Sequence, residues 1–185
     1  MKVTNTKLDG VLIIEPVYHQ DYRGYYSEVY SKKTLEQLGI FNTFVQDNHS
    51  YTIKKDTIRA IHFQNNPKSQ CKLVRCTNGR VLDVVVDLRQ DSPTYKQWIS
   101  VELSKENKKQ VYIPHGFGHG FLTLCDDCEV LYKVDQYYDP TLDRAIAWND
   151  PQINILWQVK DPIISLKDSN APTLKDSDVN FKMEQ

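Results

Sequence analysis

The sequence has no long apolar run, no block of charge of one sign and no internal repeat. Its 185 residues include 23 Lys and Arg residues against 24 Asp and Glu residues. Because neither sign clusters, we expect no extended electrostatic surface of the kind that binds nucleic acid or an anionic membrane. The balance of charge favours a small molecule or another protein as the partner.

Segments that target proteins to membranes are also missing. The start of the chain, MKVTNTKLDG, has no apolar core of a signal peptide, and apolar runs such as VLDVVVDL are short and carry Asp83 and Asp87. A membrane-spanning helix needs about 20 largely apolar residues. We therefore expect a soluble, cytoplasmic protein. Its length suits one core, so we predict a single domain over residues 1–185.

The cysteines are few and occur in two pairs. Cys71 and Cys76 flank the segment KLVR, and Cys125 and Cys128 form the sequence CDDC. Such pairs can indicate a four-cysteine zinc site. In a strand, however, positions 71 and 76 point to opposite faces, and CDDC has the composition of an acidic hairpin turn. Ordinary reduced thiols are therefore the favoured interpretation, with a zinc site as the alternative.

Short segments rich in Val, Ile, Tyr and Phe recur between turn residues, which is typical of strands. The expected strands are GVLIIEPV, YYSEVY, TIRAIHFQ, CKLVRC, GRVLDVVVDL, QWISVEL, QVYIP, HGFLTL, EVLYKVDQYY and AIAWND. They predict an all-β antiparallel sandwich or barrel. One helix is expected in SKKTLEQLG, with Ser31 as N-cap and Gly39 beyond its end. A weaker helical region follows WNDPQ, in a segment whose composition also fits a loose tail.

The stretch YIPHGFGHGF, residues 112–121, contains two histidines, His115 and His119, four residues apart. On a helix such a pair could share a metal ion, but the proline and three glycines disfavour a helix here. As a strand, the segment places His119 on the same face as Phe117 and Phe121. A histidine between aromatic side chains on one strand face indicates the interior of a barrel.

TIRAIHFQNNPKSQCKLVRCTNG and PHGFGH resemble the two sequence motifs of the cupin superfamily, whose fold is a jelly-roll barrel. Gly79 ends the first motif, but its metal ligands are missing: Gln64 stands two residues after His62, and Lys72 occupies the stretch where a carboxylate is expected. Amide and ammonium groups are poor ligands for a divalent metal. The resemblance therefore implies a cupin-type double-stranded β-helix with a few short helices and no metal. His119 is then free for a role other than metal binding.

A closer resemblance covers nearly the whole chain. The segments that carry it are, in order, DYRGYYSEVY, FVQDNHSYT, IRAIHFQ, QCKLV, DVVVDLRQDSPTY, IPHGFGHGF, VLYKVDQYYDP, WNDP and ISLKDSNAP. Each alone is weak, but all nine in register are similar to the dTDP-4-dehydrorhamnose 3,5-epimerases. The resemblance implies an isomerase that inverts C3 and C5 of dTDP-4-keto-6-deoxy-D-glucose, giving dTDP-4-dehydro-L-rhamnose, and that needs no metal or other cofactor.

The chemistry of that reaction needs three kinds of group. Because the C4 ketone acidifies the hydrogens on C3 and C5, inversion requires a base on one face of the sugar, an acid on the other and a stabiliser of the enolate oxygen. The resemblance implies His62 as the base supported by Asp168, Lys72 at the enolate oxygen and Tyr132 as the acid. A neutral histidine, with a pKa of about 6.5, suits the base.

Taken one at a time, these residues have simpler interpretations. His62 could be a core histidine, Tyr132 a packing residue and Asp168 a solvated charge of the tail. Lys72 is more informative, because its neighbours on the same strand face are Val74 and Cys76, and a lysine among apolar residues is uncommon.

The resemblance also implies a set of substrate-binding residues. They are Arg23, Glu28, Gln46, Asn48, Arg59, His119 and Tyr138. Arginine suits the paired oxygens of a diphosphate, and Tyr138 matches an aromatic that stacks near the thymine. Since N-terminal strands cross to a partner subunit in this family, Arg23 and Glu28 are expected to complete the neighbour's site in a homodimer.

The segment DTIRAIHFQ raises two further points. Arg59 and His62 lie an odd number of residues apart, so both reach a substrate only if there is a β-bulge or the ligand lies over the strand edge. Ala60 replaces a glycine usual in the family, and by alternation its methyl is expected on the His62 face. Gly118, where the family commonly has alanine, is expected to open space nearby.

Three alternatives to the double epimerase stay open at the level of sequence. An epimerase of C3 alone or C5 alone, acting on a nucleotide-linked 4-keto-6-deoxy sugar, would carry the same residues. A metal-dependent cupin would need a bound metal. A sugar-nucleotide-binding cupin without catalysis would bind dTDP and exchange no protons, and the presence of all four catalytic residue types argues against it.

Overall fold

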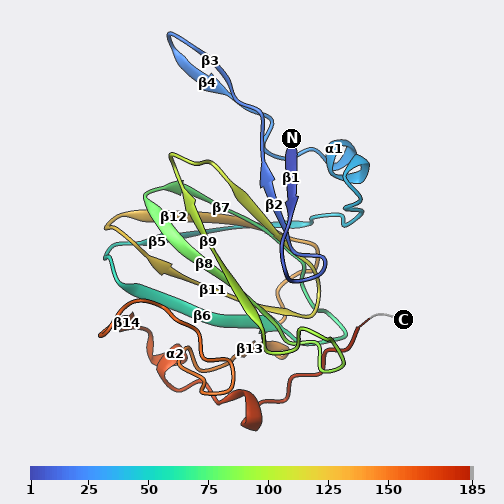
Figure 1. The fold of residues 1–185 in the computed structure, drawn as a ribbon, viewed down its shortest axis with the longest axis vertical. Helices are drawn as coiled ribbons and strands as arrows, with labels where there is room; N and C mark the ends of the chain where they lie inside the picture. Colours follow the sequence, from blue (N-terminus) through green and yellow to red (C-terminus); the bar gives the residue numbers. More distant parts are fainter. Residues whose placement is uncertain (184–185) are drawn as a thin grey trace.

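Two β-sheets make up the body of the protein in the computed structural model, which describes residues 1–183. The first sheet has the strand order β1 (Lys2–Asn5), β2 (Leu12–Glu15), β10 (Gln110–Ile113), β7 (Lys72–Asn78), β12 (Cys128–Val134), β5 (Gln46–Thr52). The second has the order β13 (Asp143–Ala145), β6 (Thr57–Gln64), β11 (Phe117–Thr123), β8 (Arg80–Asp87), β9 (Trp98–Ser104). The sheets face each other (Figure 1). This is the cupin-type jelly roll that the sequence predicted.

The remaining elements are short. A hairpin of β3 (His19–Asp21) and β4 (Gly24–Tyr26) projects from the body (Figure 1), so only the start of the expected strand YYSEVY is a strand. Helix α1 spans Lys32–Gln37, and the sequence predicted its ends correctly: Ser31 caps it by accepting from the N–H of Thr34, and Gly39 follows with a positive φ of 84°. Among residues 1–183, no helix is long and apolar enough to span a membrane.

Some of the strands were not expected from the sequence. Strand β5, QDNHSYT, is polar along its length, yet it pairs with β12 over all seven residues. Strand β14 (Ile163–Ile164) adds to the edge of β6 in parallel. Both were absent from the expected strands, because backbone pairing with a neighbour stabilises a strand whose own side chains bury little.

The interior between the sheets is apolar. Phe117 and Phe121 of β11 pack there with Val74 and Cys76 of β7, while the glycines of β11 face the other side of the second sheet. The alternation predicted for this strand is therefore confirmed. Cys71 lies in a separate core under α1, so the four thiols do not converge on one point and the zinc alternative is not supported.

The C-terminal segment covers the outer face of the second sheet. After β13 the chain runs beneath β6 (Figure 1) and forms two single turns, α2 (Leu166–Ser169) and a 3-10 helix (Leu174–Asp176). Trp157 and Phe181 are buried there against β6 and β8. The interpretation of this segment as a loose tail is wrong, because a few large apolar residues hold an otherwise polar chain in place.

A bulge in β6 decides which face each of its residues from Arg59 to His62 points to. His119 of β11 lies opposite His62, but Phe121 lies opposite Arg59, so the register shifts between them. Ala60 and Ile61 consequently both face the outer core, and Arg59 and His62 share the inner face. Of the two possibilities left open for the latter pair, the structure shows the bulge, whereas the expectation that the methyl of Ala60 lies on the His62 face is wrong.

Gly118 also behaves differently from the expectation. A Cβ added there would lie 2.5 Å from Cγ2 of Ile61 and 2.9 Å from Cδ1 of Leu88. The space beside this glycine is therefore filled by outer-core side chains, and none is opened toward the inner face of the sheet.

Gly118→Ala is expected to destabilise the fold by about 1–3 kcal/mol, the usual cost of overpacking a core. Adding Ile61→Leu removes the branch at Cβ that the new methyl would meet, so the double variant should regain part of that loss. Urea denaturation of Gly118→Ala, Ile61→Leu, the double variant and the wild type measures both effects. Equal midpoints for Gly118→Ala and the wild type would show that the contact relaxes without cost.

Candidate functional site

A cavity of about 260 Å³ lies between the two sheets at one end of the barrel. It is lined by Gln46, Asn48, His62, Phe63, Gln64, Gln70, Lys72, Tyr132, Tyr138, Asp143 and Lys167. Three of the four predicted catalytic residues are in this set, and the fourth, Asp168, is hydrogen bonded to one of them. The structure thus brings together residues from five separate segments of the chain.

One contact at this cavity pairs His62 with Asp168. The His62 Nε2 atom lies 2.7 Å from Oδ1 of Asp168, whose side chain is only 3 % exposed. Burial acts to raise the pKa of Asp168, but hydrogen bonds from His62, the Ala60 backbone and Ser165 hold it below the usual value. An ionised carboxylate only accepts, so Nε2 of a neutral His62 carries the proton and Nδ1 has a lone pair. This geometry is that of an oriented base.

Lys72 is the buried cation of the cavity. Its side chain is 7 % exposed, its Nζ atom donates to the carbonyl oxygen of His62 at 3.3 Å and lies 5.9 Å from the ring centre of Tyr132. Burial lowers its pKa to about 8, although the carboxylates of Asp83 and Asp143 favour the charged form. The group is therefore mostly an ammonium at neutral pH and can stabilise a nearby oxyanion.

Tyr132 enters the cavity from β12, in the sheet opposite His62. Burial raises its pKa, and the charge of Asp143 raises it further, while Arg59 acts in the other direction. The phenol is therefore neutral at physiological pH and can donate a proton. Since the two sheets face each other, a ligand between them would have His62 on one side and Tyr132 on the other.

A second histidine and carboxylate pair lies behind the first. His119 Nε2 lies 2.8 Å from Oδ2 of Asp83, and both side chains are buried. Burial lowers the pKa of His119 despite the neighbouring carboxylate. Oδ1 of Asp83 has no hydrogen-bond partner within residues 1–183, and the charge of Asp83 favours protonated Lys72. His119 does not itself line the cavity, so contact with a ligand stays a prediction.

Sequence reasoning missed the functional candidate Asp83, although a signal was available. The aspartate interrupts the apolar run VLDVVVDL, where a buried charge needs a partner. It also missed Asp143 and Lys167, which form an ion pair of 2.5 Å at the cavity. Nothing in their sequence context distinguishes them from ordinary surface charges.

Some of the other predicted binding residues line this cavity and others do not. Gln46 and Asn48 of β5 line the cavity and are hydrogen bonded to each other, and Tyr138 is held by its N–H to Oε1 of Gln46 at 3.2 Å. Arg59 lies on the His62 face of β6 but turns to β5, where its guanidinium donates to Thr52 and to the Tyr51 carbonyl.

Arg23 and Glu28 are not brought to this cavity. Arg23 lies at the turn between β3 and β4, where it is paired with Asp21 and its side chain is 74 % exposed. Glu28 accepts from the hydroxyl of Thr34 at 3.1 Å. Neither residue lines the cavity of its own chain.

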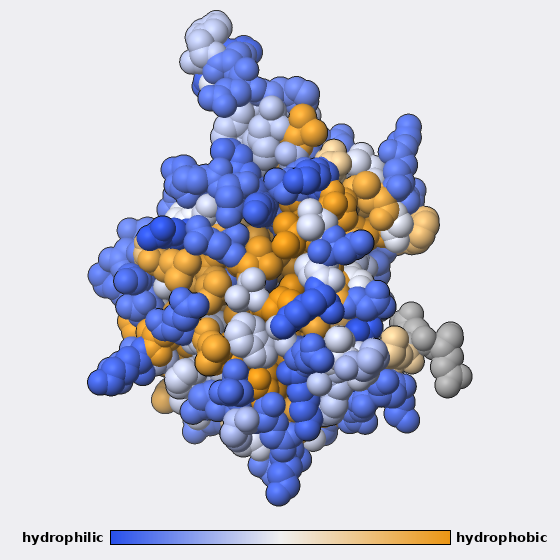
Figure 2. Space-filling view, viewed as in Figure 1, coloured by the Kyte–Doolittle hydropathy of each residue, from blue (hydrophilic) through white to orange (hydrophobic). Residues whose placement is uncertain are grey.

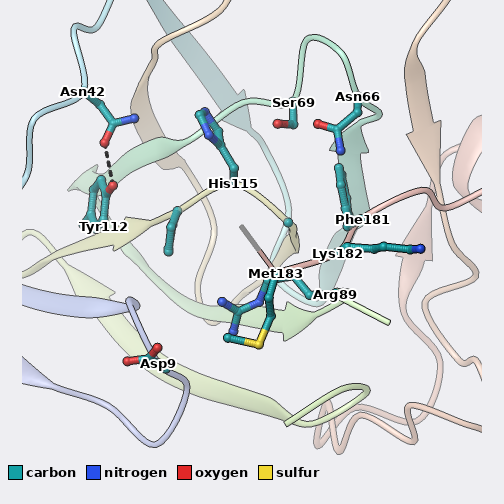
Figure 3. A pocket seen from close by; sticks show the side chains of 12 residues that line it. Asp9, Asn42, Asn66, Ser69, Arg89, Tyr112, His115, Phe181, Lys182 and Met183 are labelled. Atoms are coloured by element: carbon teal, nitrogen blue, oxygen red, sulfur yellow. Dashed lines mark hydrogen bonds between the residues drawn. The ribbon is translucent and has the colours of Figure 1, made fainter. Parts of the chain in front are cut away.

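A larger cavity, of about 360 Å³, contains none of the predicted site residues. Figure 3 shows the side chains around it, among them Arg89, His115 and Tyr112, whose hydroxyl donates to Asn42 at 2.7 Å. His115 is paired there with Asp135 at 2.8 Å, so the two histidines of PHGFGH serve different places. Cavity size alone does not select the site, because the cavity that contains His62, Lys72 and Tyr132 is smaller than this one.

Comparison with known proteins identifies the family. The family model described as dTDP-4-dehydrorhamnose 3,5-epimerase matches residues 5–176. The chain belongs to this family. It is 49 % identical over 176 residues to the dTDP-4-dehydrorhamnose 3,5-epimerase of Salmonella typhimurium, covering 94 % of this chain and 96 % of that one.

Solved structures agree with this family. The epimerase of Legionella pneumophila in complex with dTDP-4-keto-L-rhamnose superposes with a TM-score of 0.91 at 41 % identity, covering 96 % of this chain and 94 % of that one. ChmJ, a 3'-monoepimerase of Streptomyces bikiniensis in complex with dTDP-quinovose, superposes with a TM-score of 0.86 at 33 % identity. The superposition covers 92 % of this chain and 86 % of that one. The same fold therefore occurs in epimerases of different scope.

The unusual protonation of Lys72 can be measured directly. In NMR spectra of protein with ¹³C-labelled lysine, the Cε signal of Lys72 is the one that disappears in Lys72→Met. In the wild type this signal should titrate with a midpoint of about 8, well below that of an exposed lysine. Asp83→Asn should lower the midpoint further, because it removes a charge that favours the ammonium. Asp126→Asn, at an exposed turn, is the matched control and should leave it unchanged. A midpoint near 10 would show that the ammonium is solvated.

Proposed function

We propose that this protein is an epimerase that inverts C3 and C5 of dTDP-4-keto-6-deoxy-D-glucose and releases dTDP-4-dehydro-L-rhamnose. The observation that carries the proposal is the His62–Asp168 pair, which shares one cavity with Lys72 and Tyr132. Membership in the epimerase family supplies the substrate class. The fold by itself would leave the reaction open, because one fold carries many functions.

His62 removes the proton from the carbon next to the ketone. Asp168 accepts from Nε2, which keeps the lone pair on Nδ1 and stabilises the imidazolium that forms. Asp168 is itself held by α2, where the Ser165 hydroxyl accepts from its N–H at 3.1 Å. The base is therefore fixed in orientation before a substrate arrives.

Lys72 stabilises the enolate oxygen that develops at C4. A buried ammonium acts more strongly there than one in water, because the surroundings screen it less. Its position beside the His62 carbonyl and the Tyr132 ring keeps it between base and acid. The charge that forms on proton removal thus meets a fixed positive charge.

Tyr132 returns a proton from the opposite side. Inversion requires the new hydrogen to arrive on the face from which none was taken, and β12 lies in the sheet opposite β6. The raised pKa of Tyr132 keeps its hydroxyl protonated until the carbanion forms. The same pair of residues can serve C3 and C5 in turn, since both carbons flank the same ketone.

A homodimer that exchanges its N-terminal hairpins is part of the proposal. The hairpin β3–β4 projects away from its own barrel (Figure 1). It exposes aromatic and basic side chains, and Tyr22 is 97 % exposed. On the face in Figure 2 this projection is coloured hydrophilic to pale, which suits contact with a polar nucleotide. Arg23 and Glu28 would then reach the partner's cavity. A single domain and a cytoplasmic location stay predictions from sequence.

The second candidate is an epimerase of one carbon. ChmJ, whose fold is similar at 33 % identity, is a 3'-monoepimerase, so fold likeness does not discriminate. The alanine at position 60, which replaces a glycine usual in the family, does not favour this candidate, because its methyl faces the outer core and not the proposed site.

Proton NMR of dTDP-4-keto-6-deoxy-D-glucose with the protein in D₂O tests the proposal. We expect deuterium at C3 and C5. His62→Ala should abolish exchange at both carbons, because no carbanion forms without the base. Tyr132→Phe should allow exchange but block completed inversion, because it removes the acid and leaves the base. Exchange at one carbon would select the single epimerase, and near-normal turnover by His62→Ala would refute the mechanism.

Subunit exchange tests the shared site. Arg23→Ala and His62→Ala should each be inactive or strongly impaired alone. Refolding them together in equal amounts should restore about a quarter of wild-type activity, because half of the dimers are mixed and each mixed dimer has one intact site. Two chains that both carry Arg23→Ala and His62→Ala are the control. No recovery in verified mixed dimers would show that Arg23 acts within its own chain.

A further inference from the structure

Three thiols gather around the turn between β11 and β12. Cys125 lies in this turn and Cys128 begins β12, and their Sγ atoms are 3.6 Å apart. Cys128 Sγ also lies 3.2 Å from the carbonyl oxygen of Cys125. Cys76 of β7 is close enough to influence both electrostatically, but its own thiol donates to the carbonyl of Asn78 at 3.0 Å. The closest pair is therefore the one in CDDC.

The turn between β7 and β8 packs directly on this pair. Gly79, with a φ of +70°, approaches so closely that a Cβ there would lie 2.8 Å from the sulfur of Cys128 and 3.0 Å from that of Cys125. The absence of a side chain at this position leaves room for both sulfurs side by side.

The two thiols differ in access. Cys125 is half-buried and lines an open cavity of about 420 Å³ together with Arg80, Glu102 and Glu106. Cys128 is fully buried, and burial raises the pKa of its thiol. A reagent in solution can therefore react with Cys125 before it reaches the buried Cys128. The proposed reaction cavity contains neither cysteine.

We propose that Cys125 and Cys128 are a dithiol that a low-molecular-weight disulfide converts into an intramolecular disulfide across the CDDC turn. The Cys125 thiolate attacks the external disulfide, forming a mixed disulfide and releasing one thiolate. Cys128 then loses its proton and attacks the Cys125 sulfur, which releases the second thiolate. The protein dithiol loses two electrons and two protons, and the external disulfide is reduced to two thiols.

The geometry requires only a small change. A disulfide needs an S–S distance of about 2.05 Å, so the sulfurs must approach by roughly 1.6 Å from their present contact, within the reach of side-chain rotation. The bond would join the turn after β11 to the start of β12, and these two strands carry His119 and Tyr132. Oxidation would therefore cross-link the connection between the two sheets that leads from His119 to Tyr132.

Incubation of the folded, reduced protein with oxidised glutathione, followed by acid quenching and mass spectrometry, tests this modification. We expect the loss of two hydrogen masses, confined to the tryptic peptide of residues 110–133 that contains both cysteines. Reduced glutathione in excess should reverse it. A wild-type protein that stays reduced, or that only accumulates glutathione adducts, would overturn the proposal.

Single variants assign the roles of the sulfurs. Cys128→Ser should trap one glutathione on Cys125, because the attacking thiol is gone, and Cys125→Ser should resist modification. Cys76→Ser is the matched control and should form the disulfide at the wild-type rate. A disulfide that appears in Cys125→Ser, linking the peptide of residues 76–80 to that of residues 110–133, would assign the couple to Cys76 and Cys128 instead.

Discussion

The bulge in β6 is the constraint on which the site depends. A regular strand would turn Arg59 and His62 to opposite faces, and the shift of register against β11 turns both to the inner face instead. The two residues between them, Ala60 and Ile61, are buried together in the outer core. One strand therefore supplies the proposed base on one face and an anchor for the C-terminal segment on the other.

The outer core completes the site through that segment. Trp157 and Phe181 are buried against the second sheet, and burial of each large apolar side chain contributes roughly 1.5–3 kcal/mol. This packing holds more than 20 residues of polar, proline-containing chain in a defined path, along which α2 carries Asp168 to within hydrogen-bond distance of His62. The burial that holds the segment in place also removes the carboxylate of Asp168 from water, so the same packing serves both stability and the proposed chemistry.

The titratable residues around the cavity are divided between the two sheets. The second sheet carries His62 and, behind it, the buried pair of His119 and Asp83, while the first carries Lys72 and Tyr132. Burial pushes the pKa of Lys72 down and that of Tyr132 up, so an ammonium of lowered pKa lies beside a phenol of raised pKa. Groups with such opposed shifts suit the transfer and stabilisation of charge over a short distance.

The sequence by itself determined the fold class, the ends of α1 and the alternation of β11, because these follow from local periodicity and capping. Similarity of ordered motifs also named His62, Lys72 and Tyr132, which the structure brings into one cavity. Only the tertiary structure decided the face of Ala60, the filled space beside Gly118, the strand identity of β5 and the partners of Asp83. Each of these depends on register or on contacts between distant segments, and a one-residue shift of register reverses every face that alternation predicts.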